Sequence, residues 1–214
     1  MGNVYAEISV SLDGFVAGPN INPENPLGER GERLHDWVVG LESWRAGHGK
    51  SGGSSGRDNE VMQESVARGG AVIMGKNMFG PGEGAPKDDG SWQGWWGDDP
   101  PFHKPVFVLT HQEREPLELT DTTFTFVGDG PEAALELARD AAGNEDVQIA
   151  GGASAIQQYL RAGLVDELYL HVAPLLLGGG VRLFDNLDGA DPKLEPVEVV
   201  ESPVVTHVRY RVSK

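Results

Sequence analysis

Short apolar stretches alternate with helix-forming segments through the second half of the chain, and this alternation constrains the fold more than any other feature. Strands that are connected by helices run parallel in one sheet, and the connecting helices cover its faces. The apolar runs that predict strands are 106–109, 124–127, 147–150 and 167–173, and the segments that predict helices are 131–142 and 154–162. The sequence therefore predicts an α/β fold with a mostly parallel central sheet flanked by helices.

The two ends of the chain show a period of two, which is typical of strands. Apolar residues occupy every second position from Val4 to Leu12, and this strand is expected to end at Asp13-Gly14. The segments 197–200 and 205–212 are linked through Glu201-Ser202-Pro203, and the second of them alternates in the same way. We expect this C-terminal pair to form an antiparallel hairpin at one edge of the sheet.

The middle of the chain is less regular, and we expect it to hold two helices and one strand. One helix is predicted near 32–44, and a second over 59–68, where Asp58 would cap the first turn and Gly69-Gly70 would end the helix. The apolar run 71–74 predicts a short buried strand. Two segments that are dense in glycine, with serine or proline, are expected to be flexible excursions near 47–57 and 80–105.

Composition excludes several classes of function. The chain has 17 Lys and Arg against 33 Asp and Glu, so its formal charge of −16 disfavours binding to nucleic acid or anionic lipid. No apolar run approaches the roughly 20 residues that cross a bilayer, and residues 1–10 lack the features of a secretory signal. The absence of cysteine removes disulfides, thiolate catalysis and cysteine-ligated metal sites. We expect a soluble, cytoplasmic protein.

The strongest motif is a glycine pair between a predicted strand and a predicted helix. The strand 147–150 leads into Gly151-Gly152, and small residues then open the next helix. Backbone N–H groups and the helix dipole at such a turn favour an anion, and glycine lets a phosphate approach the main chain. The alternative is an ordinary tight turn in which glycine only eases the geometry, and the motif alone does not decide between the two.

Two other predicted strands end in polar or basic residues. Gly75-Lys76 follows the strand at 71–74, and Thr110-His111 follows the strand at 106–109, with Arg114 close behind. Because the carboxyl ends of parallel strands meet at one edge of a sheet, these residues are expected to share one ligand-binding crevice. Solvated strand ends are the alternative for any one of these segments taken singly.

Five motifs occur in the order seen in the dihydrofolate-reductase-like family. They are Ser11–Ala17, Val72–Lys76, Pro105–Thr110, Ile149–Ser154, and Val165–Leu168 with Pro174–Phe184. The chain most resembles the reductase domain of bacterial riboflavin-biosynthesis deaminase-reductases, the RibD C-terminal domain, and its stand-alone relatives. The resemblance covers nearly the whole chain, so it implies one domain of this fold over residues 1–214. It also implies an NADPH-dependent reductase, often a homodimer.

The resemblance assigns cofactor contacts to four segments. Gly75 to Met78 would flank the adenosine and its phosphates, Thr110 and His111 would lie by the 2′-phosphate, Gly151 to Ala155 would hold the pyrophosphate, and Ala17 would approach the nicotinamide. The Gly151–Gly152 peptide is expected to be cis, as in the family. The residues implied in NADPH binding are Ala17, Gly75, Lys76, Asn77, Met78, Thr110, His111, Gly151, Gly152, Ala153, Ser154 and Ala155.

Lysine at position 76 departs from the family pattern, which usually has arginine there. Lysine keeps the positive charge but loses the bidentate fork that suits a phosphate. The expected preference for NADPH over NADH is therefore softened.

The substrate side of the site is less clearly marked than the cofactor side. Asp36 is the nearest counterpart of the carboxylate that orients the pterin in folate reductases, and a solvated helix carboxylate is the alternative. Ser9, Trp37 and Trp96 are further candidates for substrate contact. The tryptophans of residues 92–96 could close over a planar heterocycle, but packing against the body of the protein is the favoured interpretation. No metal site is expected, because Asp98, Asp99 and His103 lack a recognised ligand spacing.

These observations lead to one principal hypothesis for the function and two alternatives. The protein is expected to transfer hydride from NADPH to a small nitrogen heterocycle, such as a pterin or an aminopyrimidine. The alternatives are a folate reductase proper and a nucleotide- or flavin-binding protein without hydride chemistry. The cysteine-free chain lacks the zinc motif of an attached deaminase, so a role in riboflavin synthesis would require a separate deaminase.

Overall fold

The computed structural model describes residues 1–80 and 91–213 of the chain. Among these residues, nine strands form one sheet in the order β10-β11-β8-β1-β7-β3-β4-β6-β5, and β2 pairs with β9 in a small separate sheet. The strands are β1 Val4–Ser11, β2 Phe15–Ala17, β3 Ala71–Gly75, β4 Val106–Leu109, β5 Leu117–Leu119, β6 Thr122–Val127, β7 Val147–Gly151, β8 Glu167–Ala173, β9 Val181–Arg182, β10 Lys193–Glu201 and β11 Thr206–Ser213. The helices are η1 Gly31–His35, α1 Asp36–Val39, α2 Glu42–Gly47, α3 Arg57–Ala67, α4 Lys76–Phe79, α5 Pro131–Ala142 and α6 Ala153–Arg161, of which η1 is a 3₁₀ helix.

The centre of the main sheet is parallel, as the sequence predicts. Strands β8, β1, β7, β3, β4 and β6 run parallel to one another, and the hairpin β10–β11 continues the sheet antiparallel from β8. The short strand β5 lies antiparallel at the opposite edge. The carboxyl ends of the parallel strands therefore lie along one edge, which is where such sheets bind ligands.

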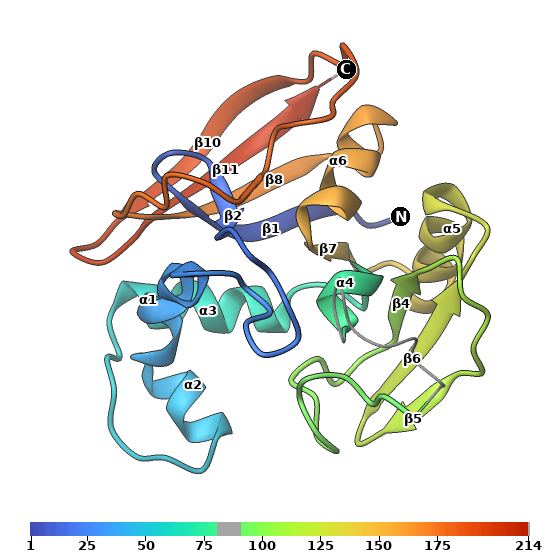
Figure 1. The fold of residues 1–214 in the computed structure, drawn as a ribbon, viewed down its shortest axis with the longest axis horizontal. Helices are drawn as coiled ribbons and strands as arrows, with labels where there is room; N and C mark the ends of the chain where they lie inside the picture. The colour runs from blue at the N-terminus through green and yellow to red at the C-terminus, as the bar shows by residue number, and fades with distance from the viewer. Residues whose placement is uncertain (81–90, 214) are drawn as a thin grey trace.

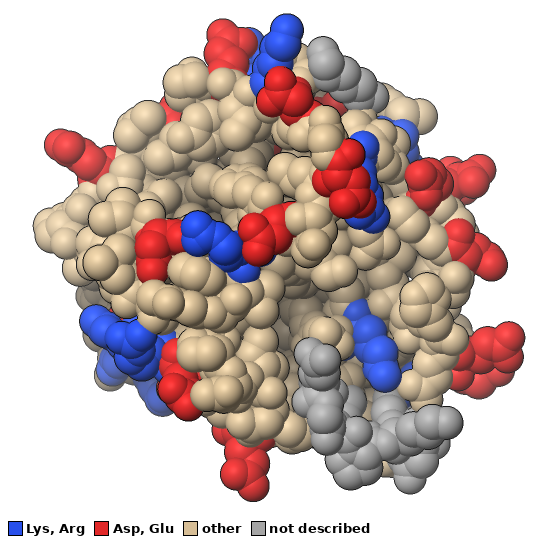
Figure 2. Space-filling model, turned by 45° about the horizontal axis from the view of Figure 1, so that its top comes forward, with Lys and Arg blue, Asp and Glu red and all other residues tan. Residues whose placement is uncertain are grey.

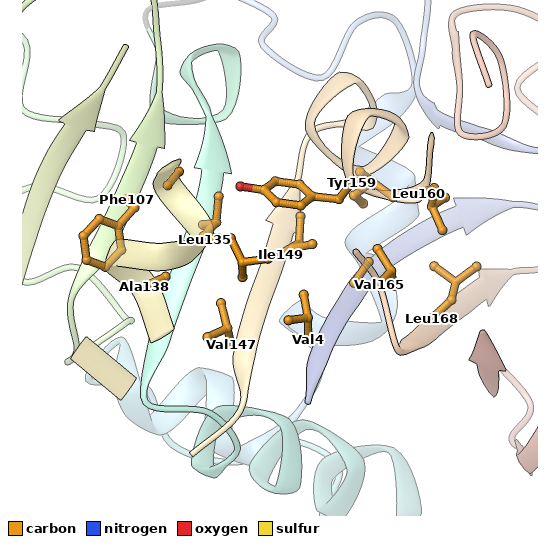
Figure 3. Packing of buried hydrophobic residues seen from close by; sticks show 14 of the residues in the cluster. Val4, Phe107, Leu135, Ala138, Val147, Ile149, Tyr159, Leu160, Val165 and Leu168 are labelled. Atoms are coloured by element: carbon orange, nitrogen blue, oxygen red, sulfur yellow. The ribbon is translucent and has the colours of Figure 1, made fainter. Parts of the chain in front are cut away.

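Helices cover both faces of the sheet (Figure 1): α5 and α6 lie on one face, and α1, α2 and α3 lie on the other. The core beneath α5 and α6 is apolar because each helix presents one hydrophobic stripe to the strands. In α6, Ile156, Tyr159 and Leu160 are buried and follow the helical period. Figure 3 shows Tyr159 above Ile149, and Leu160 above Val165 and Leu168.

The opposite face of the sheet, under α1 and α3, contains a buried polar chain. Glu7 on β1 accepts hydrogen bonds from Ser65 Oγ at 2.6 Å and from His171 Nε2 at 2.9 Å. The Nδ1 atoms of His171 and His207 lie 2.7 Å apart, and His207 Nε2 lies 3.2 Å from Asp58 Oδ1. This chain crosses three neighbouring strands and fastens α3 to the sheet. Its buried polar groups satisfy one another, as burial requires.

Two helix predictions need correction. The helix expected near 32–44 is divided into η1, α1 and α2, because Gly40 and Leu41 interrupt it and Leu41 forms a bridge with Ser54. Asp58 does not cap α3, which begins at Arg57 after Gly56. Its carboxylate turns inward to His207, so a tertiary contact takes the place of the expected local cap.

Of the two expected excursions, the structure describes the first fully and the second in part. Residues 48–56 connect α2 to α3 and are exposed. Residues 81–90 of the excursion expected near 80–105 lie outside the described part of the chain. Four short elements were not predicted from the sequence: β2, β5, β9 and α4. No helix within residues 1–80 and 91–213 is long and apolar enough to cross a membrane.

Candidate functional site

The turn from β7 into α6 has the geometry of an anion site. Gly151 has a φ of 123°, and the Gly151–Gly152 peptide is cis, as the family resemblance implies. A Cβ on Gly152 would meet no described atom within 4 Å, so the turn faces open space. The N-terminus of α6 begins here, and its backbone N–H groups and dipole favour negative charge.

The fold brings the second glycine segment against this turn. A Cβ placed on Gly75 would lie 3.6 Å from Ala155 Cβ and 3.8 Å from the Gly151 carbonyl oxygen. A Cβ on Gly151 would lie 3.8 Å from Met78 Sδ. This proximity arises because β3 and β7 are parallel neighbours and Met74 pairs with Gly151. Residues about 75 positions apart in the chain therefore form one surface.

Lys76 and Thr110 line a common hollow beside this surface. The hollow is bounded by Lys76, Phe79, Gly80, Thr110, Gln112, Arg114 and Phe126. Thr110 Oγ1 accepts a hydrogen bond from the Gln112 N–H at 3.0 Å, which fixes the start of the loop after β4. The structure thus joins the ends of β3 and β4, as the sequence predicts.

His111 lies in a second, adjoining hollow of about 340 Å³. It is lined by His111, Gln112, Glu113, Arg114, Phe126, Gly128 and Asp129. The two hollows share Gln112, Arg114 and Phe126, so together they form one crevice along the ends of β4 and β6.

Arg114 is the cation common to both hollows. Its guanidinium carbon lies 4.7 Å from the ring centre of Phe126 and 5.4 Å from that of Phe79, and it donates a hydrogen bond to the Trp92 carbonyl. Such stacking orients the planar guanidinium. The sequence marks Arg114 only as a possible donor and gives no signal for Gln112 or Phe126, because their place at the crevice depends on the pairing of β4 with β6.

Basic side chains reach the surface of an otherwise acidic protein. Figure 2 shows a hollow in the middle of one face, bordered mainly by uncharged residues. Lys or Arg side chains lie at its margin, and along the upper margin they stand next to Asp or Glu side chains. The strong net negative charge of the chain therefore does not leave this face without cations that could meet a phosphate-bearing molecule.

Ala17 lies on β2, directly after the turn that follows β1, and pairs with Val181 of β9. Because β1 is the parallel neighbour of β7, this turn lies at the same edge of the sheet as the Gly151 turn. The position is compatible with the expected approach of Ala17 to one end of a long cofactor.

The substrate candidates fall in two separate places. Trp37 Nε1 on α1 donates to Ser9 Oγ on β1 at 3.2 Å, and both side chains are buried, whereas the neighbouring Asp36 is exposed. Trp96 packs instead on Phe124, with ring centres 6.2 Å apart, in the core cluster on the far part of the sheet. This geometry favours the packing interpretation of the tryptophan segment. Trp92 supports it, since its Nε1 donates to the Phe79 carbonyl at 2.9 Å.

The mostly parallel sheet, the glycine turn before α6 and the crevice at the carboxyl edge of the sheet belong to a dihydrofolate-reductase-like fold. The chain belongs to the RibD C-terminal domain family, whose model matches residues 3–208. The resemblance carried by the five sequence motifs is thereby confirmed.

Solved structures of low sequence identity share this fold. A putative riboflavin biosynthesis protein from Shewanella sp. PV-4 has a TM-score of 0.61 and 20% identity, over 99% of each chain. A diaminohydroxyphosphoribosylaminopyrimidine deaminase/5-amino-6-(5-phosphoribosylamino)uracil reductase from Thermotoga maritima has a TM-score of 0.57 and 15% identity, over 99% of this chain and 57% of that one. At these identities the likeness establishes the fold alone.

A curated relative adds a local match. The uncharacterized protein YwjB of Bacillus subtilis (strain 168) is 31% identical over 84 residues. The alignment covers 39% of this chain and 46% of YwjB, so it spans less than half of that relative.

Proposed function

We propose that the protein is an NADPH-dependent reductase that transfers hydride to a small nitrogen heterocycle of the pyrimidine class. Membership of the RibD C-terminal reductase family makes it an oxidoreductase. The family match favours a pyrimidine over the pterin of folate reductases. Activity on a particular pyrimidine, the use of NADPH and a cytoplasmic location are part of this proposal.

The observation that carries the proposal is the convergence of two glycine segments at the start of α6. Gly75, Met78, Gly151 and Ala155 meet there, and the crevice beyond them holds Lys76. An elongated cofactor with a central pyrophosphate needs this arrangement, in which backbone N–H groups serve the phosphates and cations lie to one side.

The proposed roles of the residues follow their places in the crevice. The turn from Gly151 to Ala155 would bind the pyrophosphate, and Lys76 would attract the phosphates of the adenosine half, the 2′-phosphate included. Thr110, His111 and Arg114 would surround the 2′-phosphate. When bound, the cofactor supplies the hydride, and the protein orients it and excludes water.

The substrate would bind on the side of Ala17 and α1. Asp36 is the carboxylate proposed to face it, because Asp36 is exposed at the first residue of α1. The hydrogen bond between Trp37 on α1 and Ser9 on β1 would fix the position of α1 on the sheet. Trp96 packs on Phe124, so it would contact the substrate only if its segment moved.

We also propose that the protein forms a homodimer through the outer strands of the sheet. Val197 and Val199 on β10 are 41% and 61% exposed, and the hairpin β10–β11 extends beyond the helices in Figure 1. An uncovered apolar edge of this kind is commonly buried by a second copy. Light scattering after size-exclusion chromatography should give twice the chain mass, and V199E should shift it toward the monomer.

Calorimetric titration with NADPH and NADH tests the cofactor assignment. K76A should weaken NADPH by about ten- to a hundredfold, the worth of one charge-assisted hydrogen bond, and should weaken NADH less. K193A is a matched control, because Lys193 is exposed on β10, away from the crevice. Equal weakening of both nucleotides by K76A would refute the role of Lys76, and absence of NADPH binding to the unmodified protein would refute the proposed function.

A further inference from the structure

The carboxylate of Asp13 connects two of the sequence motifs, Ser11–Ala17 and Pro174–Phe184. The proposed cofactor contacts do not fully explain either motif. Asp13 lies in the turn after β1, and its Oδ1 accepts hydrogen bonds from Ser11 Oγ at 2.6 Å and from the Leu177 N–H at 3.1 Å. Its Oδ2 accepts from the Gly178 N–H at 2.7 Å. The motif Ser11–Ala17 is thus fastened to a loop about 165 residues later in the chain.

Other contacts extend this junction toward β2. The Phe15 N–H donates to Ser11 Oγ at 2.9 Å, so the hydroxyl that serves Asp13 also fixes the start of β2. Arg182 donates to the Asp13 carbonyl oxygen at 3.2 Å, and its guanidinium carbon lies 4.7 Å from the ring centre of Phe15. From the other side, Arg30 donates to the Leu177 carbonyl.

The loop held by Asp13 lies directly against Ala17. A Cβ placed on Gly180 would lie 2.1 Å from the Ala17 carbonyl oxygen, so only glycine fits there. Val181 then pairs with Ala17. The segment 177–181 therefore forms one wall next to Ala17, and Asp13 determines where that wall lies.

The electrostatics of Asp13 suit a permanent junction. The hydrogen bond from Ser11 and the backbone N–H groups of Gly178 and Leu177 lower the pKa of Asp13 to about 2, against a smaller effect of burial in the other direction. Asp13 is therefore ionised throughout the physiological pH range. A charged acceptor forms stronger hydrogen bonds with N–H donors than a neutral acceptor does.

We propose that Asp13 is a positioning residue for the nicotinamide half of the cofactor. It holds the loop 177–180 against β2 and so shapes the surface that the nicotinamide meets at Ala17, without contacting the cofactor itself. This inference rests on the proposed function, because it takes the cofactor to be NADPH with its nicotinamide at Ala17. The adenosine half would bind at Lys76 and Thr110, which follow β3 and β4, and its binding is independent of Asp13.

The test compares two ligands that share the adenosine half. NADPH and adenosine 2′,5′-bisphosphate are titrated calorimetrically into the unmodified protein, D13N and the control D166N. Asparagine keeps the shape of aspartate but turns an NH₂ group toward one of the two backbone N–H donors. Asp166 makes the same kind of contact, accepting the Val4 N–H at 2.8 Å, but at the opposite end of β1.

D13N should weaken NADPH by about tenfold if the loop 177–180 then holds its binding position about a tenth of the time, and it should leave the bisphosphate within about twofold. D166N should leave both affinities unchanged. Equal weakening of the two ligands by D13N, or no weakening of either, would overturn the positioning role.

Amide hydrogen exchange and the titrations of the unmodified protein separate the possible failures. Amide hydrogen exchange should become faster at 177–182 in D13N and stay unchanged in D166N, whichever ligand binds. If the unmodified protein binds the bisphosphate but gains nothing from the nicotinamide half, the positioning role is wrong and the adenosine site stands. If it binds neither ligand, the proposed function fails, and the positioning role fails with it. Should D13N not fold, S11A removes one donor to Asp13 and serves as the milder variant.

Discussion

Acid should lower the free energy of unfolding through two histidines, the fully buried His207 and the half-buried His35. Burial, together with repulsion from His171, lowers the pKa of His207. The same two effects lower the pKa of His35. His207 is fully buried, and its Nδ1 lies 2.7 Å from His171 Nδ1, so a second proton on His207 would remove the acceptor of that bond.

The sign of the effect follows from linkage. Both histidines have a lower pKa in the folded state than the ordinary 6.5 of an unfolded chain, so the unfolded state binds more protons in acid. Their contribution to stability is present above pH 6.5 and is lost as the pH falls below it. If each stays neutral when folded, each lowers the free energy of unfolding by about 1 kcal/mol between pH 6.5 and 5.5.

Glu7, the carboxylate in the same buried chain as His171 and His207, acts in a lower pH range and does not obscure this window. Burial alone would raise the pKa of Glu7, but hydrogen bonds from His171 and Ser65 and the charge of His171 bring it below its ordinary value. Glu7 therefore contributes stability that is lost only at pH values below about 4.5, the ordinary value of the group.

Urea unfolding of H207N at several pH values measures the effect. Asparagine keeps an acceptor for His171 but cannot take up a proton, and it leaves Asp58 without the imidazole. At pH 7.5 the free energy of unfolding of H207N should be about 1–3 kcal/mol lower than that of the unmodified protein. As the pH falls from 6.5 to 5.5, the decrease in the free energy of unfolding should be about 1 kcal/mol smaller for H207N than for the unmodified protein. A free energy of unfolding that stays constant or rises from pH 6.5 to 5.5 would refute the reasoning.

Two further predictions concern stability. Lys104 Nζ donates to the carbonyls of Val66, Arg68 and Gly69 at 3.1, 3.2 and 2.7 Å at the end of α3, so K104M should cost about 1 kcal/mol in chemical unfolding, and no change would contradict this capping role. Phe124 is fully buried in the core cluster with Trp96, so F124A should cost about 3–5 kcal/mol, whereas F184A, at a side chain that is 42% exposed, should cost clearly less. Similar losses for these two phenylalanine variants would contradict the packing argument.

Much of the fold could be predicted because its signals are local. Apolar runs of four to seven residues are long enough to mark buried strands, and α5 occupies the predicted residues 131–142 because its N1 proline and apolar stripe agree. The short elements β2, β5 and β9 could not be predicted, since two or three residues form a strand only when a partner is present. Asp58 shows the same limit: its sequence context favours a cap, and the distant His207 determines its actual contact.

The candidate site divides in the same way. The glycine segments and Lys76 could be found from the sequence, because strand ends and glycine turns are local features and parallel strands bring their ends together. The places of Arg114, Gln112 and Phe126 could not, because they depend on which strands are neighbours.

By itself, the sequence determined the α/β class, the run of buried strands, the C-terminal hairpin and the glycine turn that opens α6. Those features follow from periodicity and backbone freedom within a few residues. Only the tertiary structure decided that Asp13 holds the loop at Leu177 and Gly178, and that Glu7, His171, His207 and Asp58 form one buried chain. A buried polar group must find a partner, and the partner is supplied by the packing of segments that are far apart in the chain.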